Sequence, residues 1–175
     1  RMRDKARAHR TYLVVPLTLR DSECADNITN AAVLLDRSGN TAGIYHKYHP
    51  VADRSGQSLE GGITPGNAFP VFDCDFGKLG IQICWDMSYE DGWLALAKQG
   101  AEIVALSSAS PQTARPASYA LRGQYYVVSS THGHNASLFN PLGRITQQIT
   151  NRGVMVTQVG LELRKSDSVS VQECA

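Results

Sequence analysis

The stretch from Leu79 to Ser108 restricts the fold more than any other part of the sequence. An apolar run, LGIQIC, ends at Cys84, and a helical pattern that includes GWLALAKQ follows it. A second apolar run, AEIVALSS, begins immediately after Gly100, where a left-handed helix end is expected. A strand, a helix and a strand in this order predict a βαβ unit with parallel strands and a right-handed crossover.

The rest of the chain is richer in strands than in helices. Ser88 and Asp91 have the spacing of a capping box, which predicts that the helix of the βαβ unit opens there. Further strands are expected at Thr11–Leu17, in a hairpin over Ala31–His49, in a hairpin with its turn at Cys74–Lys78, and in the runs YYVVSST, NASLFN, RITQQIT and GVMVTQVGL. Helices are expected over the first ten residues and around Ser118–Gln124, and a polar loop over Asp21–Asn30. This balance predicts an α/β domain in which sheets pack on each other with helices outside.

Size and composition limit the possible classes of protein. The 175 residues fit a single domain, and 42% hydrophobic against 19% charged residues is a globular composition. A net charge of +1, with both signs interspersed, argues against nucleic acid or a membrane surface as partner. No run has the length of a membrane span. Four scattered cysteines (Cys24, Cys74, Cys84 and Cys174) form no C-x-x-C pair, which favours a reduced, cytoplasmic protein.

Cys84 has two interpretations at this stage. Reactive groups in α/β sheets gather at the carboxyl ends of strands, and the N–H groups of a following helix favour a thiolate or an oxyanion. A cysteine that ends a strand is also a common core residue, because free cysteine is among the most buried residue types. Position alone leaves both interpretations open.

Several segments together resemble the carbon–nitrogen hydrolase (nitrilase) superfamily. They are GIYHKYHP, TPGNAFPVFDCDFGKLGIQICWD, LALAKQGAEIVALSSAS and NPLGRITQQIT, in this order and spacing. The resemblance implies an α-β-β-α sandwich of two mixed sheets with outer helices. It also implies an enzyme that hydrolyses non-peptide carbon–nitrogen bonds, with neither a cofactor nor a metal.

The resemblance also implies roles for individual residues. Cys84 would be the nucleophile, Lys47 would place its ammonium beside the developing oxyanion, and Glu60 would orient the lysine or the substrate. Asp86 matches an acidic position of the family motif, although it could instead cap the start of the helix. The expected oxyanion and substrate-binding residues are Trp85, through its backbone N–H, Asp86 and Ser108.

The chain departs from the family pattern in two respects. In CWDMSYED, Ser88 stands where many members have arginine and Glu90 where they have proline, which is expected to change the pocket rim. The general base of the family's Glu-Lys-Cys triad has no match among the acids before Lys47, which are Asp4, Asp21, Glu23, Asp26 and Asp36. The chain is therefore expected to be an N-terminally truncated fragment that lacks the first strands, a helix and the base glutamate, and to be inactive alone.

The expected substrate is a small amide, N-carbamoyl compound or nitrile. CWD resembles the amidase-type members of the superfamily, whereas true nitrilases more often have CWE, and this resemblance implies amide rather than nitrile hydrolysis. The loops Pro50–Thr64 and Ala109–Ala117 are expected to shape the pocket. The resemblance further implies a homodimer or a higher homo-oligomer.

Two other classes of function compete with this interpretation. A non-catalytic nitrilase-fold subunit could use Trp93 and Leu96 for assembly, although these residues also suit packing of the helix on its own sheet. A metal site could use histidines, either His46 with His49 or His132 with His134, but the sequence offers no clear third ligand.

Overall fold

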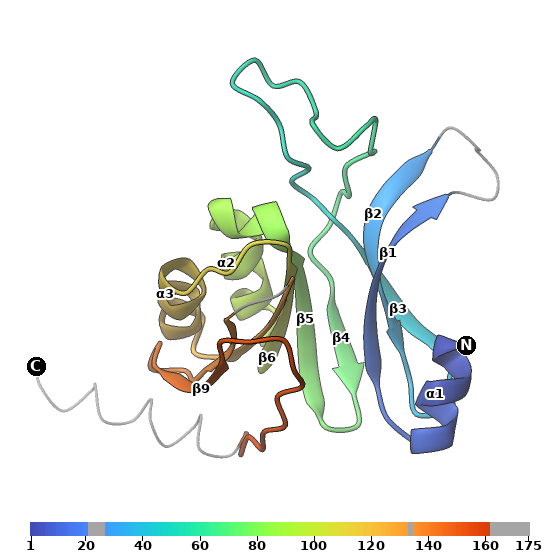
Figure 1. Ribbon diagram of the computed structural model, residues 1–175, viewed down its shortest axis with the longest axis vertical. Coiled ribbons are helices and arrows are strands. Elements are labelled where there is room, and N and C mark those ends of the chain that lie inside the picture. Colours follow the sequence, from blue (N-terminus) through green and yellow to red (C-terminus); the bar gives the residue numbers. More distant parts are fainter. Residues whose placement is uncertain (21–26, 133–134, 162–175) are drawn as a thin grey trace, which may run out of the picture.

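Two sheets that lie face to face, with helices on the outer sides, make up the molecule (Figure 1). The computed structural model describes residues 1–20, 27–132 and 135–161. The packed sheets and outer helices expected from the sequence are confirmed.

The smaller sheet consists of three antiparallel strands in the described part of the chain, in the order β1-β2-β3. They are β1 (Leu13–Arg20), β2 (Ile28–Leu35) and β3 (Thr41–His46). The expected hairpin is therefore present, and the Asp36 carboxylate closes its turn by accepting from the N–H groups of Ser38 and Asn40. Of the polar loop expected over Asp21–Asn30, Ile28 to Asn30 belong to β2, and residues 21–26 lie outside the described residues.

The larger sheet has six strands within the described ranges, in the chain order β4 to β9. They are β4 (Val71–Cys74), β5 (Gly77–Ile83), β6 (Ile103–Ser108), β7 (Tyr126–Thr131), β8 (Ala136–Phe139) and β9 (Ile145–Ile149). The strands β5, β6 and β7 are parallel, which confirms the βαβ unit, and the remaining pairs are antiparallel. The carboxyl ends of β5, β6 and β7 therefore meet at one edge.

The helices cover the outer sides. The first, α1 (Met2–His9), lies against the smaller sheet, where Arg3 donates to the Thr41 hydroxyl. On the other side, α2 (Asp91–Lys98) and α3 (Ala114–Gly123) pack on the larger sheet (Figure 1). Gly100 has φ +80° and donates to the Ala97 carbonyl, which ends α2 as the sequence predicts.

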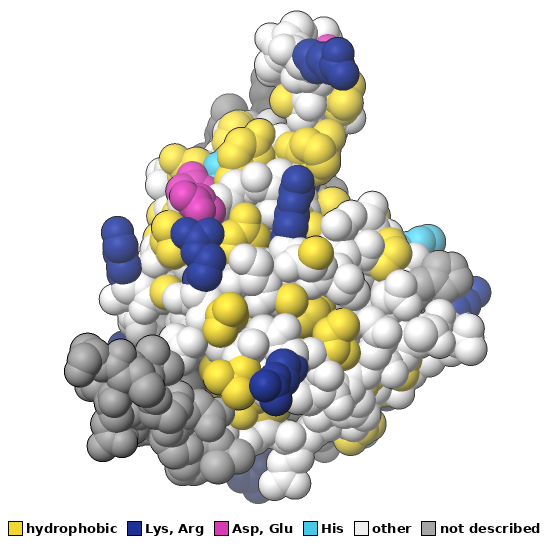
Figure 2. Space-filling view, turned by 90° about the vertical axis from the view of Figure 1, so that its left-hand side faces the viewer, with side chains coloured by type: hydrophobic (Ala, Val, Ile, Leu, Met, Phe, Trp, Pro, Cys, Tyr) yellow, Lys and Arg dark blue, Asp and Glu magenta, His cyan; other side chains and the backbone are white. Residues whose placement is uncertain are grey.

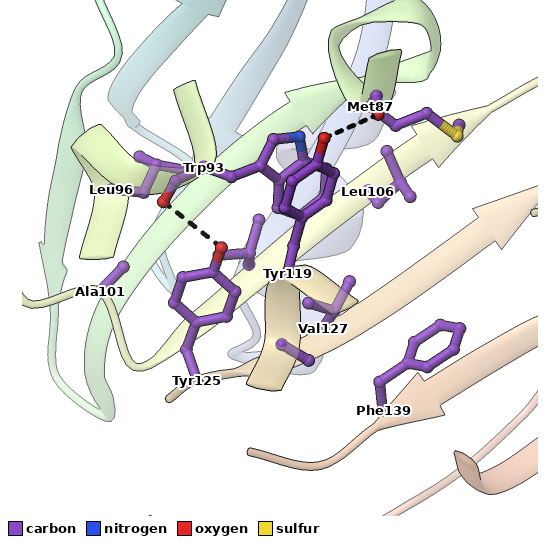
Figure 3. Close-up of a cluster of buried hydrophobic side chains, with 11 residues drawn as sticks. Met87, Trp93, Leu96, Ala101, Leu106, Tyr119, Tyr125, Val127 and Phe139 are labelled. Atoms are coloured by element: carbon purple, nitrogen blue, oxygen red, sulfur yellow. Dashed lines mark hydrogen bonds between the residues drawn. The ribbon is translucent and has the colours of Figure 1, made fainter. Parts of the chain in front are cut away.

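Two apolar layers hold these elements together. Between the sheets, alternate residues of β2, β3 and β5 interlock: Ala32, Leu34, Tyr45, Leu79, Ile81 and Ile83. Between the larger sheet and its helices, Trp93 stacks on Tyr119 with ring centroids 4.6 Å apart (Figure 3). The Tyr119 hydroxyl donates to the Met87 carbonyl, so α3 is fixed to the segment that follows β5.

Two local predictions were wrong. The run GVMVTQVGL forms no strand in the described residues, and Val154 and Val156 are 88% and 82% exposed. An apolar run becomes a strand only where a sheet edge pairs with it, and none does so here. Ser88 does not cap α2 either, because its hydroxyl accepts from Arg115 and the helix begins only at Asp91.

Gly66 provides a test of how closely the end of the loop of residues 50–66 packs against His46 and Lys47. Its N–H donates to the Lys47 carbonyl, and a Cβ added there would lie 2.1 Å from the His46 carbonyl oxygen. Because that oxygen is backbone, we expect Gly66→Ala to lower the free energy of unfolding by about 1–3 kcal/mol in urea titrations. A Cβ added at Gly153 would lie 4.0 Å from its nearest neighbour, Ile149 Cδ1. Gly153→Ala should therefore change the free energy of unfolding by less than about 0.5 kcal/mol. Equal stability of the two variants would contradict this packing.

Candidate active site

Cys84 lies at the point where β5 ends, in a backbone conformation that few residues other than glycine adopt. Its φ is +45°, whereas Ile83 before it is still extended. Such a conformation costs on the order of 1–3 kcal/mol and persists only where neighbouring contacts hold it. The next element is a five-residue 3₁₀ turn, Cys84–Ser88. The helix expected directly after Cys84 is therefore this short turn, and α2 begins further along the chain.

The Asp86 carboxylate holds this turn in place. It is 0% exposed and accepts hydrogen bonds from the Ile83 N–H (2.9 Å), the Tyr45 hydroxyl (2.8 Å) and the His49 backbone N–H (2.9 Å). Burial, and then the charge of Asp86, raise the pKa of Tyr45 far above its usual value, so this hydroxyl stays a donor. Asp86 therefore ties the cysteine turn to β3 and to the segment that follows β3.

Lys47 directly follows β3, and its side chain is buried with 1% exposure. Its backbone N–H donates to the Asn30 carbonyl (2.8 Å), and its ammonium makes an ion pair with Glu60. A buried ammonium needs such a partner, because burial without one costs several kcal/mol.

Glu60 arrives from the loop between residues 50 and 66, which stands out from the body of the molecule (Figures 1 and 2). Its carboxylate also accepts from the Val51 N–H (2.8 Å) and the Asn30 side chain (3.1 Å). Partial burial raises the pKa of Glu60, but donation from Lys47, Val51 and Asn30 outweighs burial and holds this pKa below the ordinary value. The carboxylate is therefore charged at neutral pH, as the lysine partner requires.

A cavity of about 530 Å³ brings most of the predicted site residues together. Lys47, Glu60, Cys84 and Ser108 all line it, with residues from both sheets and from the loops after β3 and β6. The complete lining consists of Pro16, Asn30, Lys47, Val51, Glu60, Ile83, Cys84, Ser107, Ser108, Ala109, Ser130, Thr131 and His132. The arrangement brings a cysteine and a lysine to one space large enough for a small organic molecule.

The remaining predicted residues lie elsewhere. Asp86 is not among the described residues that line the cavity, and its contacts fit the capping alternative. Trp85 is partly exposed, and its N–H lies at the start of the turn, where N–H groups have no acceptor within the helix. Ser88 and Glu90, expected at the pocket rim, bind Arg115 and Arg122 of α3 instead.

Sequence reasoning missed several residues that line the cavity. Asn30 on β2 is one, because nothing local shows that its side chain reaches Glu60. Ser107, Ser130 and Thr131 could have been found, since they end strands parallel to β5 and the carboxyl ends of such strands share one edge.

The histidines do not form a metal centre in the described part of the chain, where no group of three or more potential ligands gathers. The His46 ring contacts the Thr29 hydroxyl at 2.9 Å, and the His49 ring contacts carboxylates. His134 lies outside the described residues.

Comparison with solved structures identifies the class of fold. Saccharomyces cerevisiae Nit3, described as a member of branch 10 of the nitrilase superfamily, superposes with a TM-score of 0.85 at 19% identity. The superposition covers 99% of this chain and 69% of Nit3. The nitrilase-type sandwich expected from the sequence is thereby confirmed.

The sequence places the chain in a family. The carbon-nitrogen hydrolase family model matches residues 1–167, so the chain belongs to that family. It is 31% identical to a citrullinase of Francisella tularensis over 57% of this chain, 32% identical to β-ureidopropionase of Arabidopsis thaliana over 62%, and 37% identical to N-carbamoylputrescine amidase of the same plant over 43%. The matched regions amount to 35%, 27% and 25% of the length of these relatives.

Replacement of Glu60 tests the ion pair. Glu60→Gln leaves the Lys47 ammonium buried without a carboxylate, and we expect it to lower the free energy of unfolding by about 3–5 kcal/mol at pH 7. Because the pKa of Glu60 is depressed in the folded chain, its contribution is complete above the ordinary value of 4.5 and is lost as the pH falls through the folded value. Urea titrations at pH 7 and pH 3 should therefore show a smaller difference between the two proteins at pH 3.

The matched control is Glu90→Gln, which removes an exposed partner of Arg122 and should have little effect at either pH. A Glu60→Gln effect of the same size at pH 3 and pH 7 would contradict an ion pair with a charged carboxylate.

Proposed function

We propose that this chain carries the nucleophile and lysine of a hydrolase that cleaves non-peptide carbon–nitrogen bonds. The observation that carries the proposal is the shared cavity, which is lined both by Cys84 at the end of β5 and by the buried, ion-paired Lys47. A purely structural protein has no need to bury an ammonium at a cavity that contains a thiol.

The proposed reaction proceeds through a covalent intermediate. The Cys84 sulfur gives up its proton to a base and attacks the carbon of the amide, carbamoyl or nitrile group, forming a sulfur–carbon bond. For a primary amide, the carbon–nitrogen bond then breaks, and the nitrogen leaves as ammonia after taking up a proton. Water attacks the resulting thioester, releases the carboxylic acid and returns the thiol. A nitrile passes through a thioimidate instead and also yields ammonia.

Lys47 and the cysteine turn stabilise the charge that develops in this reaction. The ammonium, held by Glu60, and the N–H of Trp85 would donate to the oxyanion that forms as sulfur adds to the carbonyl carbon. The ion pair with Glu60 fixes Lys47 in position before the substrate arrives, so little reorganisation is needed during the reaction. Glu60 is thus a positioning residue for the lysine.

The proposed base is a glutamate outside residues 1–175, because no acid before Lys47 matches the base of the family's triad. Glu60 is a poor candidate for this role, because its oxygens already accept from Lys47, Val51 and Asn30. A base must be free to take a proton within hydrogen-bonding reach of the thiol.

The proposed substrate is a small amide or N-carbamoyl compound. Two of the relatives are named for such chemistry, β-ureidopropionase and N-carbamoylputrescine amidase. Val51, Glu60 and Ala109, from the two loops expected to shape the pocket, line the cavity and are the first positions to examine for selectivity.

The assembly alternative loses the contact residues first considered for it. Trp93 and Leu96 are 1% and 0% exposed and belong to the core beneath α2 (Figure 3). On the face that α2 and α3 cover, hydrophobic side chains are interspersed with polar and charged ones (Figure 2). A homo-oligomer remains part of the proposal through the family resemblance alone.

A cytoplasmic location is likewise part of the proposal, and the free thiols of Cys74 and Cys84 support it. Within the described residues, no helix is long and apolar enough to cross a bilayer.

Ammonia release by the full product of the gene tests the proposal. Amide, N-carbamoyl and nitrile substrates are compared in wild type, Cys84→Ala and Lys47→Ala, and each variant is expected to lose activity by about 10³-fold or more. Cys74→Ala is the matched control, because it removes the other free thiol of the described residues. Cys74 is not among the residues that line the cavity, so this variant should retain activity. Undiminished ammonia release by Cys84→Ala would overturn the proposal and favour a non-catalytic subunit.

A further inference from the structure

The ring of His49 lies between two carboxylates that come from different elements. Its Nδ1 is 3.3 Å from Asp86 Oδ1 in the cysteine turn, and its Nε2 is 3.2 Å from Asp91 Oδ2 at the start of α2. Each ring nitrogen thus has a carboxylate oxygen as its neighbour. The His49 backbone N–H binds Asp86 as well, so both its main chain and its side chain contact this one carboxylate.

Three aromatic side chains pack around the ring of His49. Tyr89 stacks on it with centroids 4.0 Å apart and planes 12° from parallel, while Tyr48 and Phe69 have centroids at 4.8 and 6.0 Å. The side chain of His49 is only 14% exposed. Ring nitrogens and ring faces are therefore both engaged, which leaves the imidazole little freedom to move.

We infer that His49 is a positioning residue that sets the place of Lys47 relative to Cys84. The inference rests on the proposed function. His49 belongs to the same short segment after β3 as Lys47, and Asp86 belongs to the same turn as Cys84. The bond between His49 and Asp86 thus joins the segments that carry the two reactive groups.

This bond matters because the two groups come from different sheets. Lys47 follows a strand of the smaller sheet, and Cys84 follows a strand of the larger one. The layer between the sheets is apolar and fixes their separation more strongly than their exact offset, since apolar contacts have little directionality. Hydrogen bonds are directional, so the contacts of Asp86 with Tyr45 and His49 fix that offset next to the cavity.

The two carboxylates contribute unequally. Asp86 is 0% exposed, whereas the Asp91 side chain is 52% exposed and its contact is screened by solvent. The Nδ1 contact should therefore carry the positioning, and the Nε2 contact should add little. Asparagine places an amide nitrogen near the position of Nδ1 and glutamine near that of Nε2, so the two amides separate the contacts.

The experiment compares His49→Ala, His49→Asn, His49→Gln and Asp91→Asn in the full gene product. A displacement of about 1 Å at a reacting group can cost about 100-fold, so we expect His49→Ala and His49→Gln to lower kcat by about 10–100-fold with little change in KM. His49→Asn and Asp91→Asn should stay within about 3-fold of wild type.

A second readout does not depend on turnover. Alkylation of Cys84 by iodoacetamide at pH 7 is followed by mass spectrometry, with Cys74 in the same molecule as the internal reference. In His49→Ala, displacement of the Lys47 ammonium should slow the alkylation of Cys84 about 3-fold or more and leave the alkylation rate of Cys74 unchanged. In His49→Asn, the alkylation rate of Cys84 should return to that of the wild type. Thermal unfolding is recorded for every variant, because a merely structural role would lower Tm without this rescue pattern.

The outcomes separate this inference from the proposed function. The inference about His49 would be overturned if His49→Ala kept the wild-type kcat and the wild-type rate of Cys84 alkylation. It would also be overturned if His49→Gln, and not His49→Asn, restored these two quantities. If His49→Ala fails to fold, the inference is tested by comparing kcat and the rate of Cys84 alkylation between His49→Asn and His49→Gln. If Cys84→Ala and Lys47→Ala leave ammonia release intact, the proposed function fails, and the alkylation rates still report whether His49 positions the lysine.

Discussion

The ion pair between Lys47 and Glu60 is the interaction on which the site depends. A lysine ammonium with 1% exposure is unstable in a protein interior unless a carboxylate and further hydrogen bonds compensate its lost hydration. Glu60 provides the carboxylate, and its remaining acceptor capacity is taken by Val51 and Asn30. The pair therefore attaches the loop of residues 50–66 to the smaller sheet and keeps a fixed positive charge at the cavity.

Asp86 is the corresponding centre on the larger sheet. It stabilises the positive φ of Cys84 by closing the turn, and it reaches across to Tyr45 on β3 and to His49 in the segment that follows β3. Two carboxylates, the partly buried Glu60 on the loop of residues 50–66 and the buried Asp86 in the turn after β5, thus hold the segments that carry the ammonium and the thiol. The apolar layers give the fold most of its stability, and the polar contacts determine the geometry of the cavity.

The features predicted correctly from the sequence are those encoded by local patterns. The βαβ unit, the hairpins and the end of α2 at Gly100 follow from periodicity and turn residues, and Cys84 could be placed at a strand end for the same reason. The misses arise from contacts between residues far apart in sequence. Arg115 takes the Ser88 hydroxyl away from α2, and Asn30 on β2 donates to Glu60 on the loop of residues 50–66. An apolar run such as GVMVTQVGL shows that it suits a strand but not whether a sheet edge is present to pair with it.

The loop between residues 50 and 66 closes on itself before it reaches its tip. The Leu59 N–H donates to the Val51 carbonyl, Ala52 bridges to Ser58, and Asp53 accepts from the N–H groups of Ser55 and Gln57. The base of the loop is thereby fixed independently of the length of its tip. Natural variants could gain or lose residues between Asp53 and Gln57 without moving the Glu60 carboxylate. One residue inserted between Lys47 and Val51, in contrast, would shift the Glu60 carboxylate relative to the Lys47 ammonium. Evolution can therefore vary the tip of this loop while its base stays constant.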